Sequence, residues 1–133
     1  MLIANFFACN AKIIKQKDKM QISKLVYIDG SGNTYNITTD SISYIPITPE
    51  MSSSGFYNGG SEKHNLINKA DYQNLIVLFD SIFKDKKIQI QNRIKTSGVL
   101  VRYSADNTSE EIIIAKSEKQ MHLEDYLKRL LSE

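Results

Sequence analysis

The chain has 133 residues, of which 41% are hydrophobic, and its 17 basic and 15 acidic residues leave a net charge of +2. This length suits one domain with its own core, and the balanced charge argues against a nucleic-acid or membrane-surface protein. Cys9 is the only cysteine and there are two histidines, so the sequence offers no intrachain disulfide and no Cys/His metal motif. No apolar run reaches the ~18–20 residues of a transmembrane helix. We therefore expect a soluble domain without metal or cofactor.

The N-terminal stretch 1–12 is apolar as far as Cys9 and then turns polar. Its residues 8–10, Ala-Cys-Asn, resemble the end of a bacterial lipoprotein signal, in which the cysteine is lipidated. The basic first region of such a signal is missing, and the apolar part is shorter than the usual ~7–15 residues. The interpretation that we prefer is a core strand with a buried Cys9. The compartment stays open between the cytoplasm and, if the true start lies upstream, an envelope-anchored lipoprotein with residues 12–19 as its tether.

Three strands are expected next. Residues 22–28 are rich in β-branched and aromatic side chains, residues 29–33 form a glycine-containing turn, and residues 34–38 return as the second strand of a hairpin. The segment 41–47 predicts a third strand after a tight turn. Pro46 has no amide proton for a ladder, so this third strand is expected to lie at an edge or to end there.

The segment 49–66 predicts a long loop, and its part MSSSGFYNGG, residues 51–60, has an unusual composition. Tyrosine and phenylalanine among small polar residues are typical of recognition loops, and connections of this length are often functional. The predicted binding residues are Ser53, Ser54, Phe56, Tyr57, Asn58, His64, Arg93 and Lys95. The alternative is a structural loop in which Phe56 and Tyr57 pack against the sheet edge. Burial of these two rings would indicate the structural loop, and exposure a contact surface.

A helix is expected to begin after Asn68, whose side chain can cap the first turn, and to bury an apolar stripe that includes Phe79. The alternation in residues 87–95 predicts a strand with Ile88, Ile90 and Ile94 facing inward.

Two further strands are predicted at 99–103 and 111–115. A final helix is expected to begin at Ser117, with Gln120 completing a capping box. The order strands, helix, strands, helix predicts an α+β fold, a single domain spanning 1–133. It would contain a mainly antiparallel sheet of about five to seven strands with two amphipathic helices on one face.

The sequence contains no coherent catalytic set. The serines of 52–54 precede the glycines, so no nucleophile elbow exists, and the pair His122 and Asp125 fits a helix surface. Our first hypothesis is therefore a non-enzymatic binding or accessory domain that recognises a protein or small molecule through loop 51–60. The second is a small enzyme whose site combines this loop with His64 or Arg93.

A third hypothesis, single-stranded nucleic-acid binding, would need basic residues and exposed aromatic rings on one sheet face. The candidates are Arg93, Lys95, Arg102, Tyr27, Tyr35 and Tyr103. The identity of the partner and the oligomeric state do not follow from the sequence.

Overall fold

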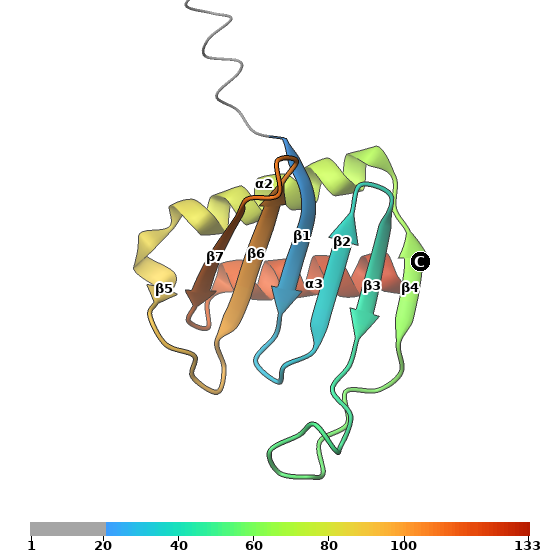
Figure 1. The fold of residues 1–133 in the computed structure, drawn as a ribbon, viewed down its shortest axis with the longest axis vertical. Coiled ribbons are helices and arrows are strands. Elements are labelled where there is room, and N and C mark those ends of the chain that lie inside the picture. The colour runs from blue at the N-terminus through green and yellow to red at the C-terminus, as the bar shows by residue number, and fades with distance from the viewer. Residues whose placement is uncertain (1–20) are drawn as a thin grey trace, which may run out of the picture.

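A computed structural model describes residues 21–133, which form one seven-stranded antiparallel sheet with both helices packed on one face (Figure 1). The strand order is β4-β3-β2-β1-β6-β7-β5. The strands are β1 (Ile22–Ile28), β2 (Thr34–Thr38), β3 (Ser41–Ile45), β4 (Lys63–Leu66), β5 (Gln89–Ile90), β6 (Gly98–Ser104) and β7 (Ser109–Ile114). The predicted α+β class is confirmed. The predictions for Cys9 and for an N-terminal strand lie outside the described residues.

The hairpin of β1 and β2 sets the two faces of the sheet. Leu25 lies opposite Ile37 and Tyr27 opposite Tyr35, so their side chains share one face. This face carries the main core, together with Ile42, Leu100 and Ile114 from the other strands. The opposite face carries a smaller apolar cluster around Val26, Val99 and Val101.

Two capped helices complete the core. Helix α2 (Lys69–Lys84) begins after Asn68, whose Oδ1 accepts the Asp71 amide at 2.7 Å. Helix α3 (Glu118–Ser132) begins after Ser117, whose Oγ accepts the Gln120 amide at 3.2 Å. The helix residues buried against the sheet are Tyr72, Leu75, Phe79, Ile82, Phe83, Gln120, Leu123, Leu127 and Leu130. Both helices begin where their capping residues predicted.

The structure corrects the expected strand 87–95. Residues 86–88 form the short 3₁₀ helix η1, and only the two residues of β5 pair with β7. The side-chain amide of Gln89 donates to the Phe83 carbonyl at 2.8 Å, which ties the segment to the last turn of α2. Ile94, expected to face inward, is 55% exposed. The alternation of Ile and Gln therefore did not produce a full strand.

The predicted loop 49–66 contains an unpredicted strand, β4, which pairs with β3. As a result β3 is not an edge strand, although it does end at Ile45, directly before Pro46. The polar sequence of β4 suits its place at the edge of the sheet, where few side chains need to be buried.

Candidate functional site

Loop 51–60 extends beyond the end of the sheet between β3 and β4 (Figure 1). Phe56 is 88% exposed and Met51 is 62% exposed. Ser54 and Asn58 shape the backbone of this loop: Ser54 Oγ accepts the Phe56 amide at 3.2 Å, and Asn58 Oδ1 accepts the Gly60 amide at 2.9 Å. Ser53 is exposed. The loop therefore presents two large apolar side chains to solvent on a backbone ordered by its own polar residues.

Asn33 fastens the base of the loop to the β1–β2 turn. This buried side chain donates through Nδ2 to the Tyr57 hydroxyl at 2.8 Å and to Asp29 Oδ2 at 3.0 Å. Its Oδ1 accepts the Ile47 amide at 2.9 Å. A Cβ placed on Gly59 would lie 2.2 Å from Asn33 Oδ1, so only glycine permits this approach. The base is thus held by side-chain contacts that are far apart in the sequence.

Phe56 and Tyr57 have different environments. Phe56 projects into solvent, whereas Tyr57 is 37% exposed and uses its hydroxyl to accept the hydrogen bond from Asn33. The geometry gives Tyr57 an anchoring position and leaves Phe56 available for contact.

His64 lies on β4, directly opposite Ser43 on β3. Its Nδ1 is 3.0 Å from Ser43 Oγ, and its Nε2 is 3.8 Å from Glu62 Oε2. A serine beside an imidazole that a carboxylate approaches is the arrangement of a nucleophile, a base and an orienting group. The His64 side chain is 66% exposed, however, so solvent surrounds the group.

Arg93 and Lys95 lie in the connection between β5 and β6. His64 lies on β4, and β4 and β5 are the two opposite edge strands of the sheet. Arg93 donates through Nη2 to the Asp29 carbonyl at 3.0 Å. Lys95 lines a pocket of about 280 Å³ at the start of α3. The structure therefore does not bring Arg93 and His64 into one site.

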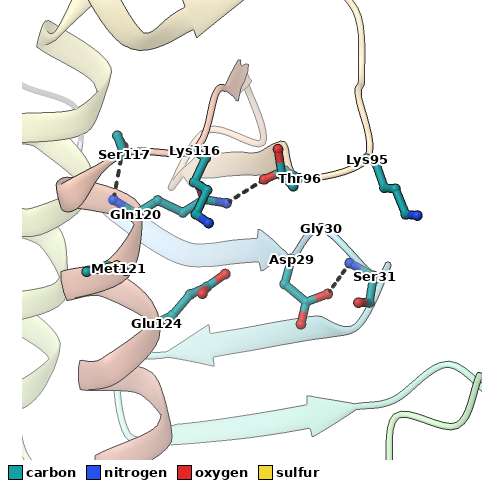
Figure 2. A pocket seen from close by; sticks show the side chains of 10 residues that line it. All are labelled: Asp29, Gly30, Ser31, Lys95, Thr96, Lys116, Ser117, Gln120, Met121 and Glu124. Atoms are coloured by element: carbon teal, nitrogen blue, oxygen red, sulfur yellow. Dashed lines mark hydrogen bonds between the residues drawn. The ribbon is translucent and has the colours of Figure 1, made fainter.

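The pocket at the start of α3 is bordered by the β1–β2 turn, the 95–96 segment and the first turns of the helix (Figure 2). Its lining residues are Asp29, Gly30, Ser31, Lys95, Thr96, Lys116, Ser117, Gln120, Met121 and Glu124. Two lysines and two carboxylates give it mixed charge. The Asp29 carboxylate is already used by its own turn, where it accepts the amides of Ser31 and Asn33.

A polar network joins two lining residues of this α3 pocket, Gln120 and Glu124, to the buried Tyr27. Gln120 Nε2 donates to the Tyr27 hydroxyl at 3.0 Å, and Tyr27 donates to Glu124 Oε2 at 2.5 Å. Burial, and then the hydrogen bond to Glu124, raises the pKa of the Tyr27 hydroxyl far above its usual value. Gly98 leaves room for the network, since a Cβ there would lie 2.9 Å from Gln120 Nε2. Tyr27 therefore stays protonated and works as a fixed donor.

Sequence analysis missed the roles of Asn33 and Gln120. Gln120 looked like part of a capping box, but its side chain turns inward to Tyr27. Its spacing from Leu123, Leu127 and Leu130 places it on the buried stripe of α3, and this periodicity was the available sign. For Asn33, a turn residue, no comparable pattern exists.

The aromatic rings proposed for nucleic-acid stacking are largely unavailable. Tyr27 is 0% exposed and Tyr35 is 3% exposed, both on the helix-covered face. Arg102 lies over the Phe83 ring at 4.0 Å and is 3.2 Å from Glu110 Oε1. The basic and aromatic residues therefore do not form one exposed stacking surface.

Comparisons with known proteins found no matching family model, curated protein or solved structure. Within residues 21–133, no helix has the length and apolar character that crossing a membrane requires. The same residues contain no cluster of three or more His, Cys, Asp or Glu side chains arranged to hold a metal ion.

Proposed function

We propose that this chain is a small binding domain that contacts a protein partner through loop 51–60. The observation that carries the proposal is Phe56, an aromatic ring 88% exposed at the end of a loop whose base is fastened by side-chain hydrogen bonds. A large apolar ring left in water gains free energy when a partner covers it. Aromatic residues also dominate the energetics of protein interfaces.

The anchored base supports this proposal because it lowers the cost of binding. Gly59 is held from two sides: its amide donates to the Ile47 carbonyl at 2.9 Å, and its carbonyl accepts the Tyr44 hydroxyl at 2.7 Å. A loop ordered before binding loses less conformational entropy when it meets its partner. Met51, which is also exposed, adds an adaptable apolar side chain to the same loop.

Affinity capture from an extract of the source organism tests the proposal with three forms of the protein. The wild type is expected to retain a defined partner, and Phe56→Ser to lose at least about 90% of it, since truncation of a hot-spot ring costs about 2 kcal/mol or more. Val77→Ser is the matched control, because Val77 is 66% exposed on α2. Equal capture by Phe56→Ser and Val77→Ser would refute the role of the loop.

A second candidate function is hydrolysis at Ser43, for which the 3.0 Å contact to His64 Nδ1 is the specific observation. A fluorophosphonate reagent tests it, since this reagent labels serines that an adjacent base activates. Labelling of the wild type that His64→Gln abolishes would support a catalytic site. Labelling at the same rate in both forms, or in neither, would remove this candidate.

A further inference from the structure

A second pocket, of about 310 Å³, lies between the end of loop 51–60 and the C-terminal part of α3. Tyr35 and Tyr44 line it from adjacent strands, with ring centroids 5.0 Å apart. Its other lining residues are Gly59, Gly60, Ser61, Lys63, Lys128 and Leu131. This volume falls at the lower end of the range for small-molecule sites. We refer to it as the tyrosine pocket.

The Tyr35 hydroxyl has no hydrogen-bond partner among residues 21–133, although Tyr35 is only 3% exposed. The hydroxyl is not closed off from solvent, because Gln120 Oε1 is the one fully enclosed side-chain oxygen or nitrogen without a partner in the described residues. A ligand in the tyrosine pocket could therefore accept its hydrogen bond. The neighbouring Tyr44 hydroxyl differs, because it already donates to the Gly59 carbonyl. Burial raises the pKa of Tyr35 well above its usual value, so its hydroxyl remains a donor in the ordinary pH range. The tyrosine pocket thus contains one protonated hydroxyl that is free to donate.

Both charged residues that line the tyrosine pocket are basic, although Asp29 and Glu124 act on the Tyr35 hydroxyl from outside its lining. Lys63 and Lys128 line the tyrosine pocket, none of its eight lining residues is acidic, and Ser61 adds another hydroxyl. The structure shows no ion pair for either lysine with another residue of the described part of the chain. Two ammonium groups and a phenol donor match a negatively charged oxygen ligand.

The rest of the tyrosine pocket narrows the ligand class. The two aromatic rings and Leu131 provide flat and apolar surface, which suits a ligand with an aromatic body. No arginine lines the pocket to offer the bidentate fork that favours phosphate. We propose that the tyrosine pocket binds a small aromatic carboxylate, with the carboxylate between Lys63, Lys128 and the Tyr35 hydroxyl and the ring against Tyr44 and Leu131.

Titration of the isotope-labelled chain with benzoate, followed by amide chemical shifts, tests the inference. Saturable shifts are expected at β2, β3 and the last turns of α3. Benzamide, which is neutral and has nearly the same shape, is expected to bind at least about tenfold more weakly, because charge-assisted hydrogen bonds are about twice as strong as neutral ones. Inorganic phosphate is expected to give no comparable shifts in these strands.

Two variants identify the groups responsible. Tyr35→Phe removes only the unpartnered hydroxyl, and Lys128→Met removes one ammonium group; each is expected to weaken benzoate binding about tenfold. Lys86→Met is the control, since Lys86 is exposed beside β5, at the opposite edge of the sheet from β4. Well-dispersed amide spectra establish that each variant is folded.

Several outcomes would overturn the inference. These are no saturable benzoate binding, equal affinity for benzamide or phosphate, or an unchanged affinity in Tyr35→Phe. The inference does not depend on a protein partner at Phe56. Phe56→Ser is expected to leave benzoate binding unchanged, so the failure of one proposal is distinguishable from the failure of the other.

Discussion

Replacing Asn33 by alanine should release the base of loop 51–60. The substitution removes three side-chain hydrogen bonds, to Asp29, to the Tyr57 hydroxyl and from the Ile47 amide. Each such bond contributes about 0.5–1.5 kcal/mol, so we expect the free energy of unfolding to fall by about 2–4 kcal/mol. For a domain of this size the unfolding midpoint should drop by about 6–15 °C.

Urea unfolding followed by circular dichroism measures this loss of stability. Two further variants test whether the loss comes from the hydrogen bonds of Asn33. Tyr57→Phe removes one of the three bonds and should cost about 1 kcal/mol. The double variant, Asn33→Ala with Tyr57→Phe, should lose less stability than the sum of the two single losses, because both changes remove the same Asn33–Tyr57 hydrogen bond. Asn36→Ala is the control, since Asn36 is half-buried on β2 and shows no side-chain hydrogen bond to another described residue. It should cost about 0.5 kcal/mol or less.

Hydrogen exchange adds a local readout. In Asn33→Ala the amides of Ile47 and Gly59 should exchange faster, because the first loses its acceptor and the second lies against Asn33. The argument is refuted if Asn33→Ala lowers the free energy of unfolding no more than Asn36→Ala does. It is also refuted if Asn33→Ala is destabilised while exchange at both amides is unchanged.

Three other predictions concern the network, the C-terminus of α3 and acid stability. Gly98→Ala should lower the free energy of unfolding by about 1–3 kcal/mol in urea titration, because the added Cβ would lie 2.8 Å from Tyr27 Cε1; a smaller loss than 0.5 kcal/mol would contradict it. Asn65→Ala should speed amide exchange in β4 and cost about 1–2 kcal/mol, since Asn65 Nδ2 donates to the carbonyls of Leu130 and Glu133; unchanged exchange there would count against this role. Lys84, hydrogen-bonded to Asp80, lowers the pKa of that carboxyl. A lowered folded-state pKa gives stability that is present above the unfolded-state pKa of about 3.9 and is lost as the pH falls through the folded value. Stability should therefore decline below about pH 4, and Asp80→Asn should make the decline shallower; equal slopes would refute this contribution.

The parts of the fold that local chemistry determines were predictable from the sequence. The β1–β2 hairpin has a segment rich in β-branched and aromatic residues before its glycine-containing turn and a returning strand after it, and its observed strands end where the pattern predicted. Asn68 and Ser117 cap the two helices through their own side chains, which is again a local interaction. Each of these elements is specified within a few residues of itself.

The predictions from sequence were wrong where contacts between residues far apart in the chain decide the conformation. The segment 87–95 has the alternation of a strand, but Gln89 is held by α2 and Arg93 donates to the Asp29 carbonyl. Strand β4 shows no apolar alternation in its sequence. Its position is set by backbone pairing with β3 and by the contact of Asn65 with the end of α3. Neither arrangement can be read from a window of neighbouring residues.

The candidate sites also depend on contacts between residues that are far apart in the sequence. The composition of residues 51–60 indicated a contact loop, yet the partner of Tyr57 is a turn residue 24 positions earlier. The tyrosine pocket likewise combines β2, β3, the end of the loop and α3, so its donor set exists only in the folded chain.

The loop and the tyrosine pocket share one structural support. Gly59 accepts the hydroxyl of Tyr44, which lines the pocket, while its amide is held by Ile47. Phe56 lies beyond this fixed point, so a partner can contact the ring without displacing Tyr44. Conversely, a ligand that moved Tyr44 would break its bond to Gly59 and loosen the loop. A small ligand and a protein partner would then be thermodynamically linked only to the extent that each changes this one hydrogen bond.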